Sequence, residues 1–157
     1  MCDYSLHVFP NRLAVGGEEL MVHRFGGTSL GLASRLDLDL HAKRMTCQGS
    51  LWTRIKNWLE VQRTLNTPIP AVCVPPGARL LLRDIPKNLQ REIGVGDFAE
   101  VDFTEISADV NTYRDAIRFA NGRQVLMQAL REGQRVTVLS LDPVHGEERQ
   151  WLPAAVR

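Results

Sequence analysis

Apolar residues along most of the chain occur in short runs that are separated by glycine, proline and asparagine. Runs of roughly four to eight residues bounded by such turn residues are typical of β-strands. Several of them alternate apolar and polar positions, as half-buried strands do. The pattern predicts strands over residues 2–8, 12–15, 19–25, 29–33, 71–74, 79–83, 99–104, 113–119, 124–130 and 134–141.

Two stretches show a helical pattern instead. Residues 86–93 suit a short helix that ends just before Gly94, a common C-terminal cap. A longer helix is predicted from an N-cap at Ser50 to about Arg63. Its apolar positions recur at helical spacing and are Leu51, Trp52, Ile55, Trp58 and Leu59.

These elements predict an α+β fold that is mainly antiparallel β, a small barrel or sandwich with one inserted amphipathic helix. A chain of 157 residues has the usual length of one domain, so we expect residues 1–157 to form a single domain. Within it, residues 35–70 are expected to be a helical insertion and residues 142–157 a C-terminal tail. The strand at 79–83 encloses three leucines and is expected to be buried on both faces.

The stretch around the Asn-Gly pair at 121–122 gives the most specific prediction, a hairpin with a type I′ turn. The resulting register places Ile117 opposite Leu126 and Asp115 opposite Gln128. Asp115 then lies on the apolar face, where an unpaired carboxylate is costly. Two interpretations stay open. One is structural, either a hydrogen bond with Gln128 or an arginine as donor or an edge near solvent, and the other is an acid in a pocket.

The charge and composition of the chain limit which classes of partner are expected. The formal net charge of +1 favours neither nucleic acid nor an anionic membrane. No apolar run approaches the roughly 20 residues that span a bilayer, and the N-terminus lacks a signal-peptide pattern. Residues 35–63 are mildly basic and contain Trp52 and Trp58, which could stack on bases, but core packing is the favoured role of both. We therefore expect no membrane partner and consider nucleic acid unfavoured.

Three cysteines at wide spacing do not resemble a disulfide framework, so reduced thiols and a cytoplasmic location are expected. They are Cys2, Cys47 and Cys73. With the histidines they could bind a metal, but no CxxC, HxH or HExxH spacing is present. A strand over residues 2–8 also places Cys2 and His7 on opposite faces, so they would not chelate together. No cofactor motif is recognised, and no cofactor or metal is predicted. His23 is expected to be a neutral structural histidine rather than a catalytic one.

The opening Met1-Cys2 suggests a nucleophile, because removal of Met1 would leave a free α-amine beside a thiol. In this respect the chain resembles class II glutamine amidotransferases and the abasic-site-crosslinking SRAP domains. That resemblance implies Cys2 as the reactive thiol. It covers two residues only, and Asp3 departs from the pattern of both families. Asp115 is a further catalytic candidate because of its place on the apolar face of the hairpin, not because of the resemblance.

A wider resemblance begins with the heptad Met1-Cys2-Asp3-Tyr4-Ser5-Leu6-His7. It is similar to the opening of a group of small bacterial hypothetical proteins with no assigned activity. The likeness extends to Ala71-Val72-Cys73 with its Pro-Gly turn and to a later hairpin. It implies a link between Cys2 and Cys73 but no mechanism.

The function expected from the sequence is a cytoplasmic, non-catalytic, β-rich binding or interaction module. Its ligand pocket is predicted near Cys2, His7, Cys73 and Asp115. One alternative is a thiol-dependent enzyme that uses Cys2, and a second is a metal-binding protein with cysteine and histidine ligands. The sequence also allows a homodimer, formed through exposed strands or through the helix that carries Trp52 and Trp58.

Overall fold

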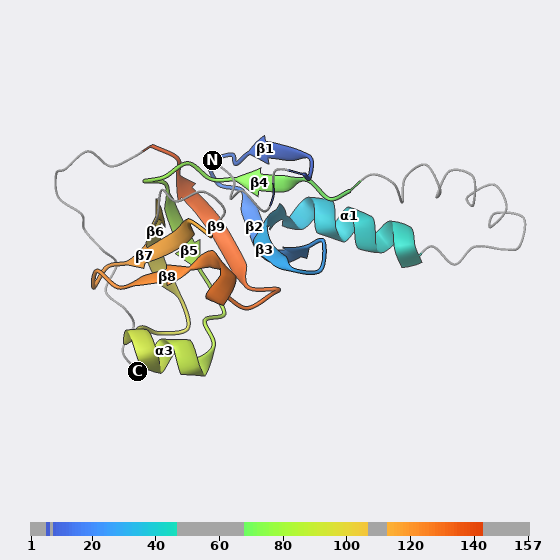
Figure 1. Ribbon diagram of the computed structural model, residues 1–157. Helices are drawn as coiled ribbons and strands as arrows, with labels where there is room; N and C mark the ends of the chain where they lie inside the picture. The colour runs from blue at the N-terminus through green and yellow to red at the C-terminus, as the bar shows by residue number, and fades with distance from the viewer. Residues whose placement is uncertain (1–5, 7, 47–67, 107–112, 143–157) are drawn as a thin grey trace, which may run out of the picture.

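The computed structural model describes residues 6, 8–46, 68–106 and 113–142, which fold as an α+β structure (Figure 1). This part of the chain holds nine strands in one sheet, two α-helices and a 3₁₀-helix. In chain order the elements are β1 (Asn11–Leu13), β2 (Glu19–Phe25), β3 (Ser29–Ser34), α1 (Arg35–Thr46), β4 (Ala71–Cys73), β5 (Arg79–Leu82), α3 (Lys87–Ile93), β6 (Ala99–Glu105), β7 (Asp115–Phe119), β8 (Gln124–Leu126), the 3₁₀-helix η2 (Met127–Ala129) and β9 (Arg135–Ser140).

The sheet is open and mixed, with the strand order β1-β4-β3-β2-β9-β5-β6-β7-β8. Only β1 and β4 pair in parallel; all the other neighbours in this order are antiparallel. The predicted α+β class and its antiparallel character are therefore confirmed. Among the described strands no closed barrel is found, because the sheet ends at β1 on one side and at β8 on the other. Within this part of the chain, each of these two edge strands has one side that pairs with no other strand.

Most strands and the short helix lie where the sequence pattern places them. The strand at 79–83 differs, because Leu80 and Leu82 are buried while Arg79 and Leu81 are only half-buried. It therefore has one core face, not two, and the leucine run concealed the alternation. The prediction of an N-terminal strand is also wrong at its described residues. Leu6 has 3₁₀ conformation, Val8 lies in a turn, and the Leu6 carbonyl accepts a hydrogen bond from the Phe9 N–H.

The inserted segment is described only in part. Its first residues form α1, which contacts β2 and β3 (Figure 1). The helix predicted over 50–63 and the tail from residue 143 onward lie outside the described residues. The single-domain organisation stays a prediction. Across the described chain, neither helix is long and apolar enough to cross a membrane.

Two apolar clusters form the interior, one on each face of the β3–β4 region. Val72 and Val74 belong to the larger cluster, together with residues from most of the sheet and from α3. Ala71 and Cys73 point to the other face and join a smaller cluster. The smaller cluster comprises Leu6, Phe25, Ala33, Ala71 and Cys73. Strand alternation thus separates residues that are neighbours in sequence.

The β7–β8 hairpin has a different turn from the predicted one. Gly122 has a φ of 83°, and Asn121 is not in the left-handed region. The Gly122 N–H donates to the Phe119 carbonyl, and the Phe119 N–H donates to the Arg123 carbonyl. This is a three-residue loop with a glycine bulge, not a two-residue type I′ turn. The register therefore shifts by one residue, and Leu126 pairs with Ala116 instead of Ile117.

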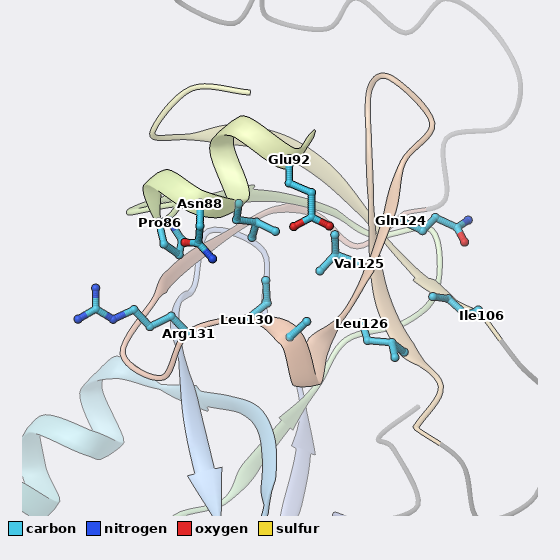
Figure 2. A pocket seen from close by; sticks show the side chains of 11 residues that line it. Pro86, Asn88, Glu92, Ile106, Gln124, Val125, Leu126, Leu130 and Arg131 are labelled. Atoms are coloured by element: carbon cyan, nitrogen blue, oxygen red, sulfur yellow. The ribbon is translucent and has the colours of Figure 1, made fainter. Parts of the chain in front are cut away.

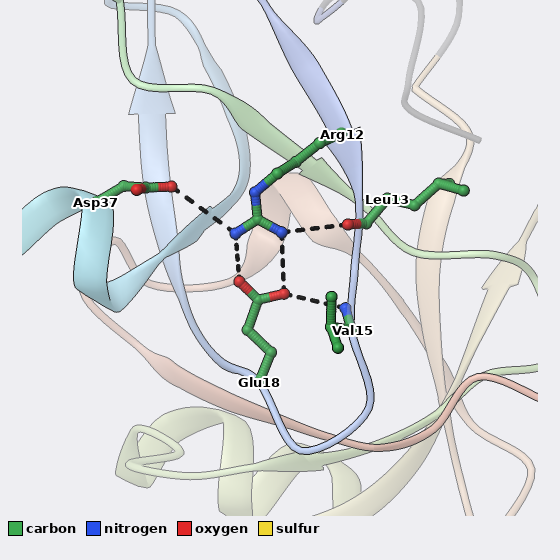
Figure 3. Close-up of polar contacts among 5 residues, drawn as sticks. All are labelled: Arg12, Leu13, Val15, Glu18 and Asp37. Carbon is green, nitrogen blue, oxygen red and sulfur yellow. Dashed lines mark hydrogen bonds and ion pairs between the residues drawn. The ribbon is translucent and has the colours of Figure 1, made fainter.

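An ion-pair network joins β1 to the turn before β2 and to α1 (Figure 3). Arg12 donates hydrogen bonds to both carboxylate oxygens of Glu18, and one guanidinium nitrogen lies 3.8 Å from Asp37. Glu18 also accepts a hydrogen bond of 3.0 Å from the Val15 N–H. The bonds from Arg12 hold the pKa of Glu18 below its ordinary value, although partial burial acts against this. The network fixes the start of the sheet against the first turn of α1.

Candidate functional site: a cleft between α3 and the β8 edge

The structure separates the site residues that the sequence suggested. Cys2 and His7 lie outside the described residues. Asp115 is buried at the start of β7 and lines a small cavity with Leu6, Val72 and Val74. The volume of this cavity is about 10 Å³, which is the space of roughly one water molecule. A cavity of this size suits a structural hydrogen bond and has no room for a substrate.

Cys73 does not share that cavity. Its side chain lies in the smaller apolar cluster, on the opposite face of β4 from Val72 and Val74. Cys73 is disulfide-bonded, which differs from the reduced thiols expected from the sequence. The other two cysteines of the chain, Cys2 and Cys47, lie outside the described residues. The predicted link between Cys2 and Cys73 stays a prediction.

Metal-ligating side chains do not gather in the part of the chain that the structure describes. No group of three or more His, Cys, Asp or Glu residues is found there with a geometry that could hold an ion. The sulfur and nitrogen ligands considered at the N-terminus, Cys2 and His7, are outside that part. The metal-binding alternative is therefore left without support from the described residues.

His23 packs as a structural residue in the middle of β2. Its ring contacts the Phe25 ring edge-on, with centroids 4.9 Å apart. Burial is the main cause that lowers the pKa of His23 below its ordinary 6.5; His41 lowers it further, and Glu132 acts in the opposite direction. The folded protein thus disfavours the imidazolium.

This lowered pKa predicts a pH dependence of stability. Below about pH 6.5 the unfolded chain takes up a proton at His23 that the folded chain resists. The contribution of His23 is therefore complete above that pH and declines as the pH falls toward the folded-state pKa. Urea unfolding should show that the free energy of unfolding falls more between pH 7.5 and pH 5.5 for the wild type than for His23→Gln. Equal losses in the two proteins would contradict the lowered pKa.

A cleft of about 770 Å³ lies between α3 and the β8–η2 segment (Figure 2). Its size is that of a ligand site. The helix contributes one wall, and the edge strand β8 with the residues after it contributes the other. The lining residues are Pro86, Asn88, Leu89, Glu92, Ile106, Gln124, Val125, Leu126, Ala129, Leu130 and Arg131.

Local sequence signals build the helix wall. Pro86 precedes the helix with an extended backbone, and Gly94 ends it with a φ of 80°, a left-handed conformation that favours glycine. Leu89 and Ile93 point into the core. Asn88 and Glu92 are one turn apart, so both reach the exposed side of the helix that faces the cleft.

The hairpin loop fixes the distance between the two walls. The Asn121 side chain donates a hydrogen bond of 2.8 Å to the Ile93 carbonyl, and the Arg123 guanidinium donates one to the Glu92 carbonyl. Both acceptors belong to the last turn of α3, where carbonyls lack helical partners. The loop that leads into β8 therefore also caps the helix. This holds α3 beside the sheet edge without closing the cleft.

The other wall is continued by η2, which replaces the strand predicted over residues 127–130. The Gln128 side chain turns away from the hairpin and bonds the backbone of Leu30 in β3, accepting from its N–H at 2.8 Å and donating to its carbonyl at 2.7 Å. These bonds direct the amide of Gln128, one of the donors considered for Asp115, to β3 instead. They also place Ala129 and Leu130 along the cleft.

The chemistry of the lining favours binding. Leu89, Val125 and Leu130 form an apolar floor, and Figure 2 shows the Glu92 carboxylate directed toward the space above Val125. Asn88 and Gln124 add polar groups at the rim. None of the lining residues is a serine, threonine, cysteine, histidine, lysine or tyrosine, so the lining supplies no hydroxyl, thiol, imidazole or amine nucleophile, and Glu92 is its one carboxylate.

Comparisons with known proteins do not identify a function, so the assignment of a site rests on the geometry of the cleft. No family model matches the chain, and neither the curated proteins nor the solved structures give a match. Sequence reasoning missed the cleft as well. It predicted the helix at 86–93, but no local pattern indicates that its exposed side lies along the edge of a strand more than thirty residues later.

Proposed function

We propose that this protein is a non-catalytic binding module and that the cleft between α3 and β8 is its ligand site. The observation that carries the proposal is the cleft itself, about 770 Å³ with an apolar floor and a few polar groups at its rim. This is the usual composition of a site that recognises a partner by burial and orients it by hydrogen bonds. The binding function agrees with the one expected from the sequence, but the site is elsewhere.

The test is a fragment screen that includes short capped peptides, read by changes in backbone amide shifts. Bound fragments are expected to move the amides of Leu89, Val125 and Leu130 more than those elsewhere. Ala129→Trp should remove this response, because Ala129 is exposed and lies on the cleft wall. Ala42→Trp adds the same bulk at an exposed position of α1 and should leave the response intact.

Two results would count against the proposal. One is a screen without any fragment that perturbs the cleft. The other is a set of fragments whose shifts centre on the Asp115 cavity or on α1 and that bind Ala129→Trp as well as the wild type.

A further inference from the structure

We propose that the cleft takes an extended peptide segment that adds to β8 as a further antiparallel strand, with a lysine or arginine of the peptide beside Glu92. This inference rests on the proposed function and deepens it by naming the class of ligand. Edge strands present unpaired backbone groups that pair readily with another chain. The edge strand β8 and the helix α3 line the two sides of the cleft, so that the edge of β8 lies in a groove.

The hydrogen-bond pattern of the hairpin shows which groups of β8 face outward. In an antiparallel ladder, residues that bond the neighbouring strand alternate with residues that do not. Because the Phe119 N–H bonds the Arg123 carbonyl at 2.9 Å, Arg123 and Val125 face β7. Gln124 and Leu126 fall on the intervening positions, so the N–H of each and the Gln124 carbonyl point away from the sheet. The Leu126 carbonyl belongs to the start of η2, because Leu126 is its N-cap.

The lining of the cleft shows that this outward edge faces the ligand space. Gln124, Val125 and Leu126 are consecutive, and all three line the cleft. Consecutive side chains of a strand point to opposite faces. Three neighbours reach the same space only when the edge of the strand is turned toward it. The backbone of β8 is therefore part of the site.

Charge and shape favour a peptide with a basic residue. No hydrogen bond or ion pair is found for the Glu92 carboxylate among the described residues, although it is directed over the cleft (Figure 2). Arg131, the cation of the lining, extends away from Val125. A strand added to β8 would direct alternate side chains toward Leu89 and Leu130. A segment with alternating apolar residues and one lysine or arginine complements both features.

A single substitution can remove the outward N–H of Leu126 from the edge of β8. Leu126 has a φ of −60°, which is the value that proline requires, and Val125 before it is extended, as a residue before proline must be. Leu126→Pro therefore deletes an outward N–H without breaking a bond to β7. Leu126→Ala is its control, because it shortens the same side chain and keeps the N–H.

The probe is a peptide chosen by panning a phage-displayed random dodecapeptide library against the full chain. We expect the selected sequences to contain alternating apolar residues with a lysine or arginine. The chosen peptide should bind Leu126→Pro about five- to tenfold more weakly than Leu126→Ala, the effect of about one lost hydrogen bond. Glu92→Gln should weaken binding and reduce its dependence on salt.

A second measurement uses the wild-type protein, so it does not depend on how the proline variant folds. N-methylation of the peptide backbone, one residue at a time, should weaken binding at every second position only. Equal effects of methylation along the peptide, or equal affinities for Leu126→Pro and Leu126→Ala, would overturn strand addition.

The remaining outcomes separate this inference from the proposed function. Fragments that occupy the cleft while no peptide is selected would overturn the inference and leave the binding site standing. If neither a fragment nor a peptide binds, the inference and the proposed function would be overturned together. A homodimer of the free protein that Leu126→Pro dissociates in light scattering would assign the β8 edge to a second copy and overturn the peptide partner.

Discussion

Replacing Leu6 by alanine is expected to lower the free energy of unfolding by about 2–4 kcal/mol, the usual cost of truncating a buried leucine. Leu6 is only 2% exposed and belongs to the smaller apolar cluster with Phe25 and Cys73. It also packs against Gly31 in β3 and lines the Asp115 cavity. Its removal would therefore open space on both sides of that strand. Urea unfolding followed by circular dichroism measures the change.

Gly31 provides the matched test of this packing. A Cβ at Gly31 would lie 2.5 Å from Leu6 Cδ1 and 3.3 Å from Phe25 Cε2, so Gly31→Ala should destabilise by about 1–3 kcal/mol through overpacking. In the Leu6→Ala background the added methyl enters vacated space, and its cost should shrink or change sign. The two substitutions would then be strongly coupled. Additive losses would show that Leu6 does not occupy the space above Gly31.

The elements of this fold are largely predictable because their signals are local. The glycine turns separate β2 from its neighbours, and the alternation over 99–104 marks β6, in which Val101 and Phe103 are buried as expected. Gly94 ends α3 as predicted. Each of these signals depends on residues within a few positions of one another, and tertiary contacts did not override them.

Long-range order is less accessible from the sequence. The apolar pattern is the same for a closed barrel and for an open sheet, because both bury one face of each strand. The strand predicted over 124–130 ends at Leu126, because Gln128 finds its hydrogen bonds on Leu30, about a hundred residues earlier. The Asn-Gly pair predicted a hairpin at the right place but not its loop length, since glycine serves both turns.

The candidate site was also only partly predictable from the sequence, because it depends on contacts between distant segments. Asp115 was predicted to lie on an apolar face, with burial or an edge near solvent left open, and the structure buries it at 8% exposed. The cleft, by contrast, depends on the bonds from Asn121 and Arg123 to the end of α3. Such a contact between a loop and a helix end leaves no periodic trace in either segment. The cleft was therefore invisible to sequence reasoning, although α3 and β8 on its two sides were predicted.

Replacing Gln128 by alanine is expected to lower the free energy of unfolding by about 2–4 kcal/mol. Leu30 is buried, and the Gln128 amide bonds both its N–H and its carbonyl, as a neighbouring strand would. Alanine leaves two buried backbone groups without these partners, and each unsatisfied group costs about 1–3 kcal/mol. Because η2 then loses its attachment to β3, amide hydrogen exchange should quicken at Leu30 and along residues 127–130.

Gln128→Glu separates the two bonds at nearly constant shape. A carboxylate still accepts from the Leu30 N–H, but its second oxygen faces the Leu30 carbonyl and supplies no proton. The variant should therefore be destabilised at neutral pH. The difference in the free energy of unfolding between the wild type and this variant should become smaller as the pH falls toward 4, because the protonated acid donates to the Leu30 carbonyl again. A deficit that is independent of pH, or a Gln128→Ala variant as stable as the wild type, would mean that the amide does not act as a strand for β3.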